Sequence, residues 1–398
     1  MSHSSITIYT LLLILTLLVS CSQLQDPSEI QNHIEEVKKA FVPDSRVDKF
    51  DISIEQGGGS HILKGETTLL KAKQVLIDTL NHLGIKVKDE ITHLPTQEIG
   101  EEKYALINNS VSNLRSTPRH SAQLITQSLL GMPLQVLKKE GGWYYVRTPE
   151  DYLGWIDAGG IHRIDEPNLN SWNDSEKIIF TDTYGFSFLE PTPNAQKVSD
   201  LVTGNILRLS ESTGNFYEVV YPDGRTAYIN KTNAQLFDEW NENLEASRNA
   251  LVNTAYEMMG IPYLWGGTST KGVDCSGFTK TIYLMNGLII PRDASQQVHA
   301  GELIDKAKNW DLLEAGDLLF FGSEATSTSS RRVVHVGMWI GDNEFIHSSR
   351  QVRISSVDPN AENYDQYNTN RYLEARRYIG NSAGNIIKAN NMYTDIKF

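Results

Sequence analysis

The sequence has little cysteine and few basic residues, and each shortage excludes a class of protein. Two cysteines among 398 residues are too few for a disulfide scaffold, and without a Cys-x-x-Cys pair they cannot form a cysteine-rich zinc site. Lys and Arg total 36 against 49 Asp and Glu, for a formal net charge of -13. That balance argues against a nucleic-acid backbone or a polybasic membrane footprint as partner. The composition is otherwise globular, 40% hydrophobic and 21% charged, and the length allows about two to four domains.

The first cysteine closes an apolar segment at the N-terminus. Residues 6–19 are mostly apolar, a run too short to span a bilayer but typical of a signal-peptide core. The stretch that ends at Ser20-Cys21 resembles the lipobox of bacterial lipoproteins, which implies cleavage before Cys21 and diacylation of its sulfur. Two acyl chains would hold the protein stably on a membrane. The absence of Lys and Arg before Ile6 departs from that pattern, and a plain secretory signal is the alternative.

The middle of the chain contains a repeat. A shift of 73 residues aligns Gly131 with Gly204 and Pro149 with Pro222 without a gap. Each copy has short runs of alternating apolar and polar residues separated by turn signals, which predicts a small all-β unit. Two copies are too few for a solenoid, so we expect tandem barrels that resemble bacterial SH3-like domains.

The segment before the repeat has a different pattern. Residues 28–41 and 67–83 have helical periodicity, and residues 50–54 and 85–87 alternate as strands do. We expect a small α+β domain there and find no chemistry in it.

The second cysteine, Cys275, carries the functional prediction. It follows the glycine-containing stretch around Gly266 and Gly267, and residues from Phe278 onward recur at helical spacing. We therefore expect Cys275 at a helix N-terminus, where unpaired N–H groups and the helix dipole would lower the thiol pKa and favour a nucleophilic thiolate.

Two histidines supply a candidate base. His335 and His347 lie six residues on either side of Gly341, within two apolar runs joined by a turn signal. On paired antiparallel strands they become near cross-strand neighbours, so one can act as base while the other orients it. The alternatives are a buried inert cysteine and structural histidines. A zinc site lacks a third ligand at suitable spacing, so we expect neither a metal nor another cofactor.

Five short motifs in this order resemble the NlpC family of cell-wall cysteine peptidases. They are Tyr263-Leu264-Trp265-Gly266-Gly267, Asp274-Cys275-Ser276-Gly277-Phe278, Gly316-Asp317-Leu318-Leu319-Phe320-Phe321, His335-Val336-Gly337 and Ile346-His347. The resemblance implies a papain-like domain that hydrolyses the γ-D-glutamyl to diamino acid bond of peptidoglycan stem peptides. It assigns Cys275 as nucleophile, His335 as base, His347 as third member and Tyr263 to the oxyanion.

SH3-like domains ahead of such a domain are similar to the γ-D-glutamyl-L-diamino acid endopeptidases of cell-wall recycling. That resemblance implies a substrate with a free N-terminal L-alanine, whose amine would be bound by Asp274, Ser276 and a barrel tyrosine, for which Tyr152 is the candidate. The residues implied for the D-glutamate subsite are Trp265, Arg292 and Ser295. Arg292 could equally form a structural ion pair, and Tyr152 could belong to the barrel core.

The predicted fold is thus a multidomain α+β protein, with a papain-like domain preceded by two SH3-like barrels and a small α+β domain. The expected segments are a signal peptide at 1–20, the α+β domain at 27–100, barrels at 105–166 and 175–238, the peptidase domain at 242–380 and a tail at 381–398. We expect a lipid-anchored, periplasm-facing protein of a Gram-negative envelope. The alternatives are a peptidoglycan-binding module with an inactive catalytic domain, and a thiol amidase or acyltransferase of related fold. The sequence does not distinguish meso-diaminopimelate from lysine or the inner from the outer membrane, and it leaves open the oligomeric state and the role of residues 323–332.

Overall fold

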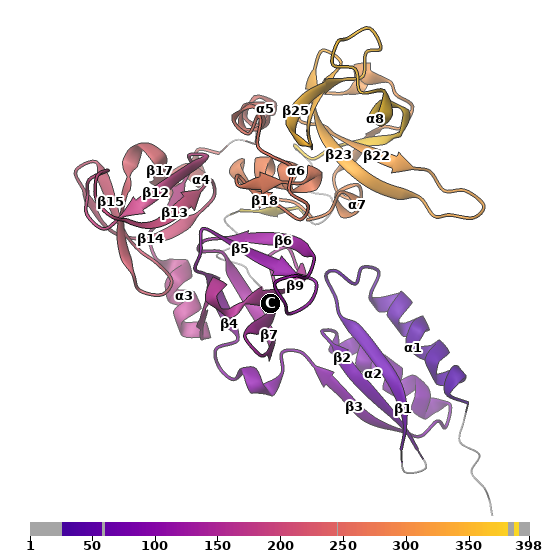
Figure 1. The fold of residues 1–398 in the computed structure, drawn as a ribbon. Coiled ribbons are helices and arrows are strands. Elements are labelled where there is room, and N and C mark those ends of the chain that lie inside the picture. The colour runs from indigo at the N-terminus through magenta and orange to yellow at the C-terminus, as the bar shows by residue number, and fades with distance from the viewer. Residues whose placement is uncertain (1–25, 58–59, 245, 381–385, 390–398) are drawn as a thin grey trace, which may run out of the picture. The chain divides into compact units, whose positions relative to one another are not determined.

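A computed structural model describes residues 26–57, 60–244, 246–380 and 386–389 (Figure 1). The predicted signal peptide and Cys21 lie outside the described residues. The chain divides into two compact units, of which the first contains residues up to Pro43 and Phe50–Thr92. The second contains Asp44–Lys49 and the chain from His93 onward. Within the described part of the chain, none of the helices combines the length and the apolar character needed to cross a bilayer.

The first unit is a three-stranded sheet with two helices. Its elements are α1 (Pro27–Phe41), β1 (Phe50–Gly57), β2 (Ser60–Thr67), α2 (Leu70–His82) and β3 (Val87–His93), with strand order β1-β2-β3. Asp26 begins α1 by accepting a hydrogen bond from the Ser28 N–H, which satisfies one otherwise unpaired donor of the first turn. The buried faces of the helices, including Ile34 and Leu76, pack with sheet residues such as Leu63. Both helices predicted from periodicity are therefore present.

The second unit begins with two seven-stranded sheets. The first sheet has the order β10-β4-β7-β8-β9-β5-β6 and the second β13-β12-β16-β15-β14-β11-β17. The strands of the first are β4 (Tyr104–Ile107), β5 (Val111–Arg115), β6 (Leu124–Leu129), β7 (Pro133–Glu140), β8 (Trp143–Arg147), β9 (Leu153–Asp157) and β10 (Ile161–Ile164). Those of the second are β11 (Lys177–Phe180), β12 (Tyr184–Phe188), β13 (Lys197–Val202), β14 (Ile206–Thr213), β15 (Phe216–Val220), β16 (Thr226–Asn230) and β17 (Ala234–Leu236). Helix α3 (Glu166–Asp174) lies between them in the chain.

The repeat seen in the sequence is also a structural repeat. Strands β7, β8 and β9 begin at residues 133, 143 and 153, and β14, β15 and β16 begin at residues 206, 216 and 226. Each start is displaced by 73 residues, the offset at which the two copies align. The same three-strand antiparallel meander therefore occupies the centre of both sheets.

The segment between the second sheet and the peptidase motifs forms more than one helix. Two helices occur there, α4 (Phe237–Glu242) and α5 (Arg248–Glu257). Ser247 has extended backbone angles and its side chain accepts a hydrogen bond from the Ala250 N–H. A serine in this conformation begins a helix rather than continuing one, because its oxygen satisfies a free N–H of the next turn.

The remainder of the chain packs a central helix against an antiparallel sheet. Helix α6 (Cys275–Met285) follows the short strands β18 (Thr268–Ser269) and β19 (Gly272–Val273) and shares a core with β23 and β24. The sheet has the order β21-β26-β22-β23-β24-β25. Its strands are β21 (Glu302–Asp305), β22 (Leu318–Ser323), β23 (Arg332–Gly341), β24 (Glu344–Ser349), β25 (Gln351–Ser356) and β26 (Tyr372–Arg377). Residues 324–331 connect β22 and β23 and are largely exposed.

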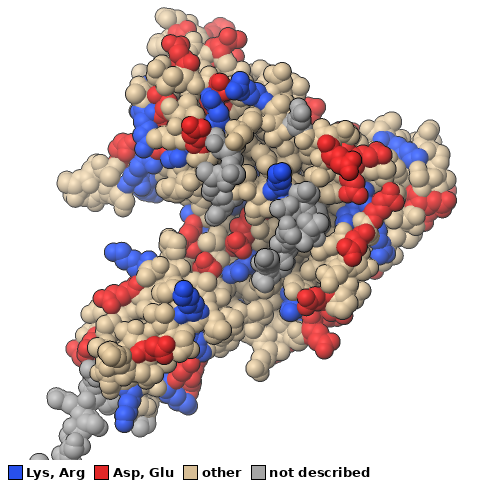
Figure 2. Space-filling view, turned by 180° about the vertical axis from the view of Figure 1, so that it is seen from behind, with Lys and Arg blue, Asp and Glu red and all other residues tan. Residues whose placement is uncertain are grey.

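Short elements complete this part of the chain. Helices α7 (Ala294–Gln297) and α8 (Gln366–Asn370) flank the sheet strands in sequence, and β20 (Leu288–Ile289) pairs with β27 (Ile387–Lys388). The described part of the predicted tail is thus tied to the chain that follows α6. Figure 2 shows acidic and basic side chains mixed over the described part of one face, the pattern of an ordinary solvated surface.

Candidate active site

Cys275 is the first residue of α6, and local chemistry explains why the helix begins there. The Asp274 side chain accepts a hydrogen bond from the Gly277 N–H at 2.7 Å and so caps the helix. Gly277 is required by close packing, since a Cβ atom at this position would lie 1.9 Å from the Gly267 carbonyl oxygen. The Asp-Cys-Ser-Gly motif therefore combines a cap, the candidate nucleophile and a close backbone approach.

The two histidines meet across the hairpin of β23 and β24. The turn is made by Asp342 and Asn343, both with positive φ, and β23 carries a bulge beside it, so that Met338 pairs with Ile346. That register makes His335 a diagonal neighbour of His347 rather than its direct partner. The His335 Nε2 and His347 Nδ1 atoms are 2.7 Å apart.

The partners of His347 favour one arrangement of protons on the two rings. On its far side, His347 Nε2 lies 3.1 Å from Ser355 Oγ and 3.9 Å from Asp365 Oδ2. These oxygens favour a proton on Nε2, which leaves His347 Nδ1 as an acceptor for the Nε2–H of His335. His335 then has a free Nδ1 lone pair, the state that a general base requires. Neither Ser355 nor Asp365 was singled out in the sequence, where no spacing rule marks them.

The sulfur of Cys275 lies against the strand that carries His335. It accepts hydrogen bonds from the backbone N–H groups of Val336 and Ser276. Burial, followed by the charge of Asp274, nevertheless raises the pKa of the Cys275 thiol to about 12. Burial, aided by Arg371, lowers the pKa of His335 to about 4. The expectation of a depressed thiol pKa is therefore wrong, because desolvation outweighs the helix N-terminus.

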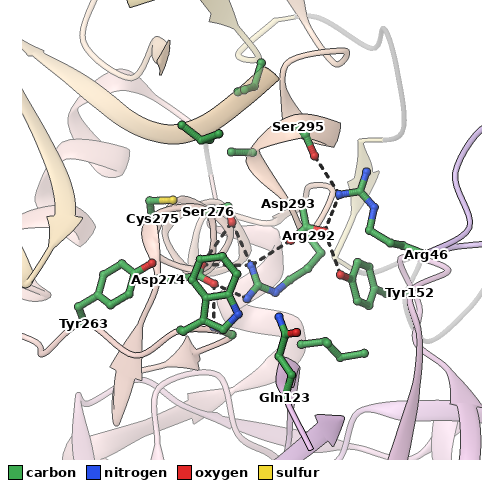
Figure 3. Close-up of a pocket in the computed structure, with 16 residues that line it drawn as sticks. Arg46, Gln123, Tyr152, Tyr263, Asp274, Cys275, Ser276, Arg292, Asp293 and Ser295 are labelled. Atoms are coloured by element: carbon green, nitrogen blue, oxygen red, sulfur yellow. Dashed lines mark hydrogen bonds and ion pairs between the residues drawn. The ribbon is translucent and has the colours of Figure 1, made fainter. Parts of the chain in front are cut away.

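Cys275 opens into a cavity of about 500 Å³ (Figure 3). The cavity brings together eight residues that the sequence singled out, namely Tyr152, Tyr263, Trp265, Asp274, Cys275, Ser276, Arg292 and Ser295. It also contains Arg46, Gln123 and Asp293, which the sequence did not indicate. His335 and His347 are not part of its lining, but Val333 and Val334, just before His335, are.

Asp274 is occupied in a way that its predicted role did not anticipate. Its Oδ1 accepts hydrogen bonds from Ser276, Gly277 and Arg292, and its Oδ2 accepts from Gly266 and Arg292. Five donors exceed the roughly four lone-pair positions of a carboxylate, so no position remains for a substrate ammonium. These contacts speak against Asp274 as the amine ligand, and its predicted role stays a prediction. The Ser276 hydroxyl is also occupied, because it donates to Asp274 and accepts from Arg292.

Arg292 is the buried partner of Asp274. Its side chain is 1% exposed and makes a two-pronged ion pair with Asp274, with the shorter contact at 2.6 Å. The Nε atom also donates to Thr126 Oγ1, on β6 of the first barrel, at 3.0 Å. Arg292 therefore holds the barrel, the helix cap and the cavity wall together, which is the structural ion pair considered from the sequence.

The opposite end of the cavity is built from three polar side chains. The Tyr152 hydroxyl donates to Asp293 Oδ2 at 2.9 Å, and Arg46 Nη1 donates to the same oxygen at 2.8 Å. Arg46 is in turn paired with Asp44 at 2.6 Å. Burial, then the charge of Asp293, raises the pKa of Tyr152 well above its usual range, so the hydroxyl stays protonated. Tyr152 is buried, yet its polar end faces the cavity rather than the barrel core.

The oxyanion candidate lies beside the sulfur. Tyr263 is partly exposed and lines the cavity with Cys275. Burial, then the charge of a Cys275 thiolate, raises the pKa of Tyr263, so the phenol remains a hydrogen-bond donor at neutral pH. Across the described residues, no group of three or more His, Cys, Asp or Glu side chains is arranged to hold a metal ion.

Comparison with known proteins gives two family matches. Residues 260–377 match the NlpC/P60 family, and residues 114–161 match the bacterial dipeptidyl-peptidase Sh3 domain. A gamma-D-glutamyl-L-lysine dipeptidyl-peptidase of Bacillus cereus is 32% identical over 269 residues, which covers 65% of this chain and 76% of the relative. Dipeptidyl-peptidase 6 of Lysinibacillus sphaericus is 31% identical over 268 residues, covering 64% of this chain and 92% of the relative.

Solved structures show the same architecture. The crystal structure of an NlpC/P60 family protein from Bacillus cereus superimposes with a TM-score of 0.59 at 26% identity, covering 69% of this chain and 99% of that one. An NlpC/P60 endopeptidase from Photobacterium damselae covers 93% of this chain and 94% of its own with a TM-score of 0.53. At 13% identity that second match shows the fold alone. The predicted multidomain α+β fold class is confirmed.

Proposed function

The chain belongs to the NlpC/P60 family of cysteine peptidases, and we propose that it hydrolyses the γ-D-glutamyl to diamino acid bond of stem peptides with a free N-terminal L-alanine. Peptidoglycan is the substrate class of this family's hydrolases, and two of its relatives carry dipeptidyl-peptidase names. The specific bond and the free amine are the finer part of the proposal. Both depend on the cavity beside Cys275.

The observation that carries the proposal is the charge balance of this cavity. Arg292 is paired with Asp274, and Arg46 is paired with Asp44. These two arginines face three carboxylates, so one negative charge is in excess. The third carboxylate, Asp293, shares Arg46 with Asp44: its Oδ2 is bonded to Tyr152 and Arg46, and its Oδ1 lies 3.9 Å from Arg292 Nη1. An ammonium group is the ligand that complements a partly desolvated carboxylate in excess. We therefore assign amine recognition to Asp293 with Tyr152, in place of Asp274.

The proposed subsites correspond to a cut fragment of two residues. If the alanine ammonium binds Asp293 and the scissile carbonyl lies at Cys275, then two residues, L-alanine and D-glutamate, occupy the cavity between them. Trp265 and Ser295 belong to the wall of the same cavity, and we propose that they contact the D-glutamate. Release of L-Ala-D-Glu is the expected result.

The chemistry would begin with transfer of the thiol proton of Cys275 to His335 Nδ1 as the sulfur attacks the carbonyl. The oxyanion would be stabilised by the Cys275 backbone N–H, unpaired at the first position of α6, and by the Tyr263 hydroxyl. The imidazolium would then protonate the leaving amine of the diamino acid. Water, activated by the neutral His335, would cleave the thioester and regenerate the thiol.

The proposal is tested by digesting L-Ala-γ-D-Glu-meso-diaminopimelate and its N-acetylated form side by side and locating the cut by mass spectrometry. We expect L-Ala-D-Glu from the free peptide and little cleavage of the blocked one. Cys275→Ala should abolish release. Equal cleavage of both peptides would refute amine recognition, and full release by Cys275→Ala would refute the mechanism.

We also propose that Cys21 carries a lipid that anchors the protein in the envelope, facing the periplasm. The support is the sequence alone, in the Ser20-Cys21 motif that follows the apolar segment. Wild type should fractionate with membranes and show a diacylglyceryl mass increment on its N-terminal peptide. Cys21→Ala should remain uncleaved and unmodified. A wild-type N-terminus without the increment would overturn the lipid anchor.

A further inference from the structure

A short piece of chain from the N-terminal region takes part in the catalytic unit. Asp44–Lys49 belongs to the second compact unit, although the residues on both sides of it belong to the first. The Leu153 N–H, on β9, donates to the Arg46 carbonyl at 2.8 Å, and the Gln296 side chain, on α7, donates to Asp44 Oδ2 at 2.8 Å. The segment is thus held by a barrel strand and by the catalytic domain at once.

This anchoring delivers one charged side chain to the substrate cavity. Arg46 Nη1 donates to Asp293 Oδ2 and, at 2.9 Å, to Ser295 Oγ, while its Nε and Nη2 atoms bind Asp44. Figure 3 shows Arg46 and Tyr152 at the side of the cavity away from Cys275. Burial opposes the charge, but the hydrogen bonds to Asp44 and the charge of Asp293 outweigh it and raise the pKa of Arg46. The guanidinium therefore stays charged and fixed at the far wall.

We infer that Arg46 is a specificity-determining residue that ends the amine subsite and restricts the enzyme to peptides whose first residue has a free amine. The inference rests on the proposed function and extends it to a residue outside both the barrels and the peptidase domain. Two effects of Arg46 favour the peptide with the free amine. Arg46 orients Asp293, and it blocks the space that a group attached to the alanine nitrogen would need.

The first effect is orientation. Arg46 and Tyr152 both bind Asp293 Oδ2, and the Asp293 side chain also accepts from the N3 backbone N–H in the capping box of α7, so the carboxylate is held in one orientation at the cavity. A side chain held by two donors loses little further freedom when the ligand binds, which favours the charged amine. An acylated alanine nitrogen is neutral and cannot compensate the remaining charge of Asp293.

The second effect is exclusion. Any group attached to the alanine nitrogen, such as the lactyl ether of a muramic acid, would have to pass Arg46, which lines the cavity and is held in place by its hydrogen bonds to Asp44 and Ser295. Displacing Arg46 would leave Asp44 without its cationic partner and would remove the nearer of the two arginines beside Asp293. The enzyme would thus discriminate in two ways: the peptide with the free amine gains contacts, and the N-blocked peptide has to disrupt the hydrogen bonds of Arg46.

The test compares kcat/KM for the free tripeptide and its N-acetylated form in the full-length wild type, Arg46→Ala, Arg46→Lys and a control. The control is Arg225→Ala, because Arg225 pairs with Asp223 two residues earlier, as Arg46 does with Asp44, but belongs to the second barrel. We expect the selectivity for the free amine to fall by at least about tenfold in Arg46→Ala, the size of a lost charge-assisted hydrogen bond. It should fall less in Arg46→Lys and stay unchanged in Arg225→Ala. Thermal unfolding of each variant verifies that it is folded. If Arg46→Ala does not fold, the selectivity of Arg46→Lys tests the role of Arg46.

The outcomes separate this inference from the proposed function. Wild type that releases L-Ala-D-Glu selectively, with the same selectivity in folded Arg46 variants, overturns the role of Arg46 alone. An equal loss on both peptides also overturns it, because Arg46 would then bind a group common to both, such as the D-glutamate α-carboxylate. Wild type that cuts neither peptide at the γ-D-glutamyl bond overturns the proposed function and this inference together.

Discussion

Alkylation of Cys275 should be slow at neutral pH. Its rate should go on rising with pH even where ordinary cysteine thiols are already ionised and react at a constant rate. Only the thiolate reacts with iodoacetamide, so the rate follows the ionised fraction. With a thiol pKa of about 12, that fraction at pH 7 is about 10⁻⁵, whereas an ordinary cysteine with pKa about 8.5 is about 3% ionised. The structure therefore predicts a rate about 10³-fold below that of a free thiol, if accessibility is equal.

The assay follows the mass of the peptide that contains Cys275 after timed exposure to iodoacetamide between pH 5 and pH 10. The logarithm of the rate should rise linearly with pH, with no plateau. Asp274→Asn keeps the helix cap but removes the charge that ranks second to burial in raising the thiol pKa. Its alkylation at pH 7 should be about tenfold faster, equivalent to one pKa unit. Asp293→Asn removes a carboxylate from the other side of the cavity and serves as the control.

A rate that is high and flat from about pH 5 to pH 8 would refute the reasoning. That profile would mean that Cys275 and His335 exist as a thiolate–imidazolium pair before the substrate binds. The thiol proton would then reside on His335 in the resting enzyme, and burial would not control the nucleophile.

Three further predictions concern the groups behind the nucleophile. Ser355→Ala should lower kcat by about tenfold with little change in KM, because His347 loses a partner that selects its tautomer. The control is Ser356→Ala, which is equally buried on the same strand but loses a different hydrogen bond and should retain kcat. Equal losses of kcat in the two variants would refute the role of Ser355 in orienting His347. Burial lowers the pKa of His347 in the folded protein well below its usual value. As the pH drops below about 6.5, His347 is therefore protonated in the unfolded chain but not in the folded one, and the urea midpoint of unfolding should fall. A midpoint that rises over that pH range would contradict this. Lys280 and Glu150 form a buried ion pair at 3.0 Å between α6 and the first barrel. Lys280→Met leaves the Glu150 charge buried without its partner, so urea unfolding should show a loss of about 3–5 kcal/mol, whereas the double variant Lys280→Met with Glu150→Gln should lose much less. Additive losses would show that the two charges do not interact.

Much of the fold could be predicted because the signals are local or periodic. The cap, the nucleophile and the close-packed glycine of α6 lie within four consecutive residues, Asp274 to Gly277, and a helix start depends on little else. The barrel repeat was visible as a constant offset between apolar positions. The pairing of His335 with His347 followed from a turn between two apolar runs, although the bulge beside the turn made it diagonal rather than direct.

Other features could not be predicted because they depend on burial and on contacts between distant residues. The thiol pKa moved against the local expectation, since desolvation of Cys275 comes from elements that pack over it. Asp274 looked available in the sequence, but Arg292, 18 residues later, occupies it.

The sequence by itself determined the family and the 73-residue repeat and indicated the candidate nucleophile and its two histidines, because each depends on residue types at fixed spacings. Only the tertiary structure pointed to Asp293 as the carboxylate that we propose for the substrate amine and to Arg46 as the arginine that we propose to close the pocket. Arg46 and Asp293 are separated by 247 residues, and no periodicity or motif links them. Their contact exists because a barrel strand and α7 both hold the segment that carries Arg46, and packing of this kind cannot be inferred from spacing along one chain.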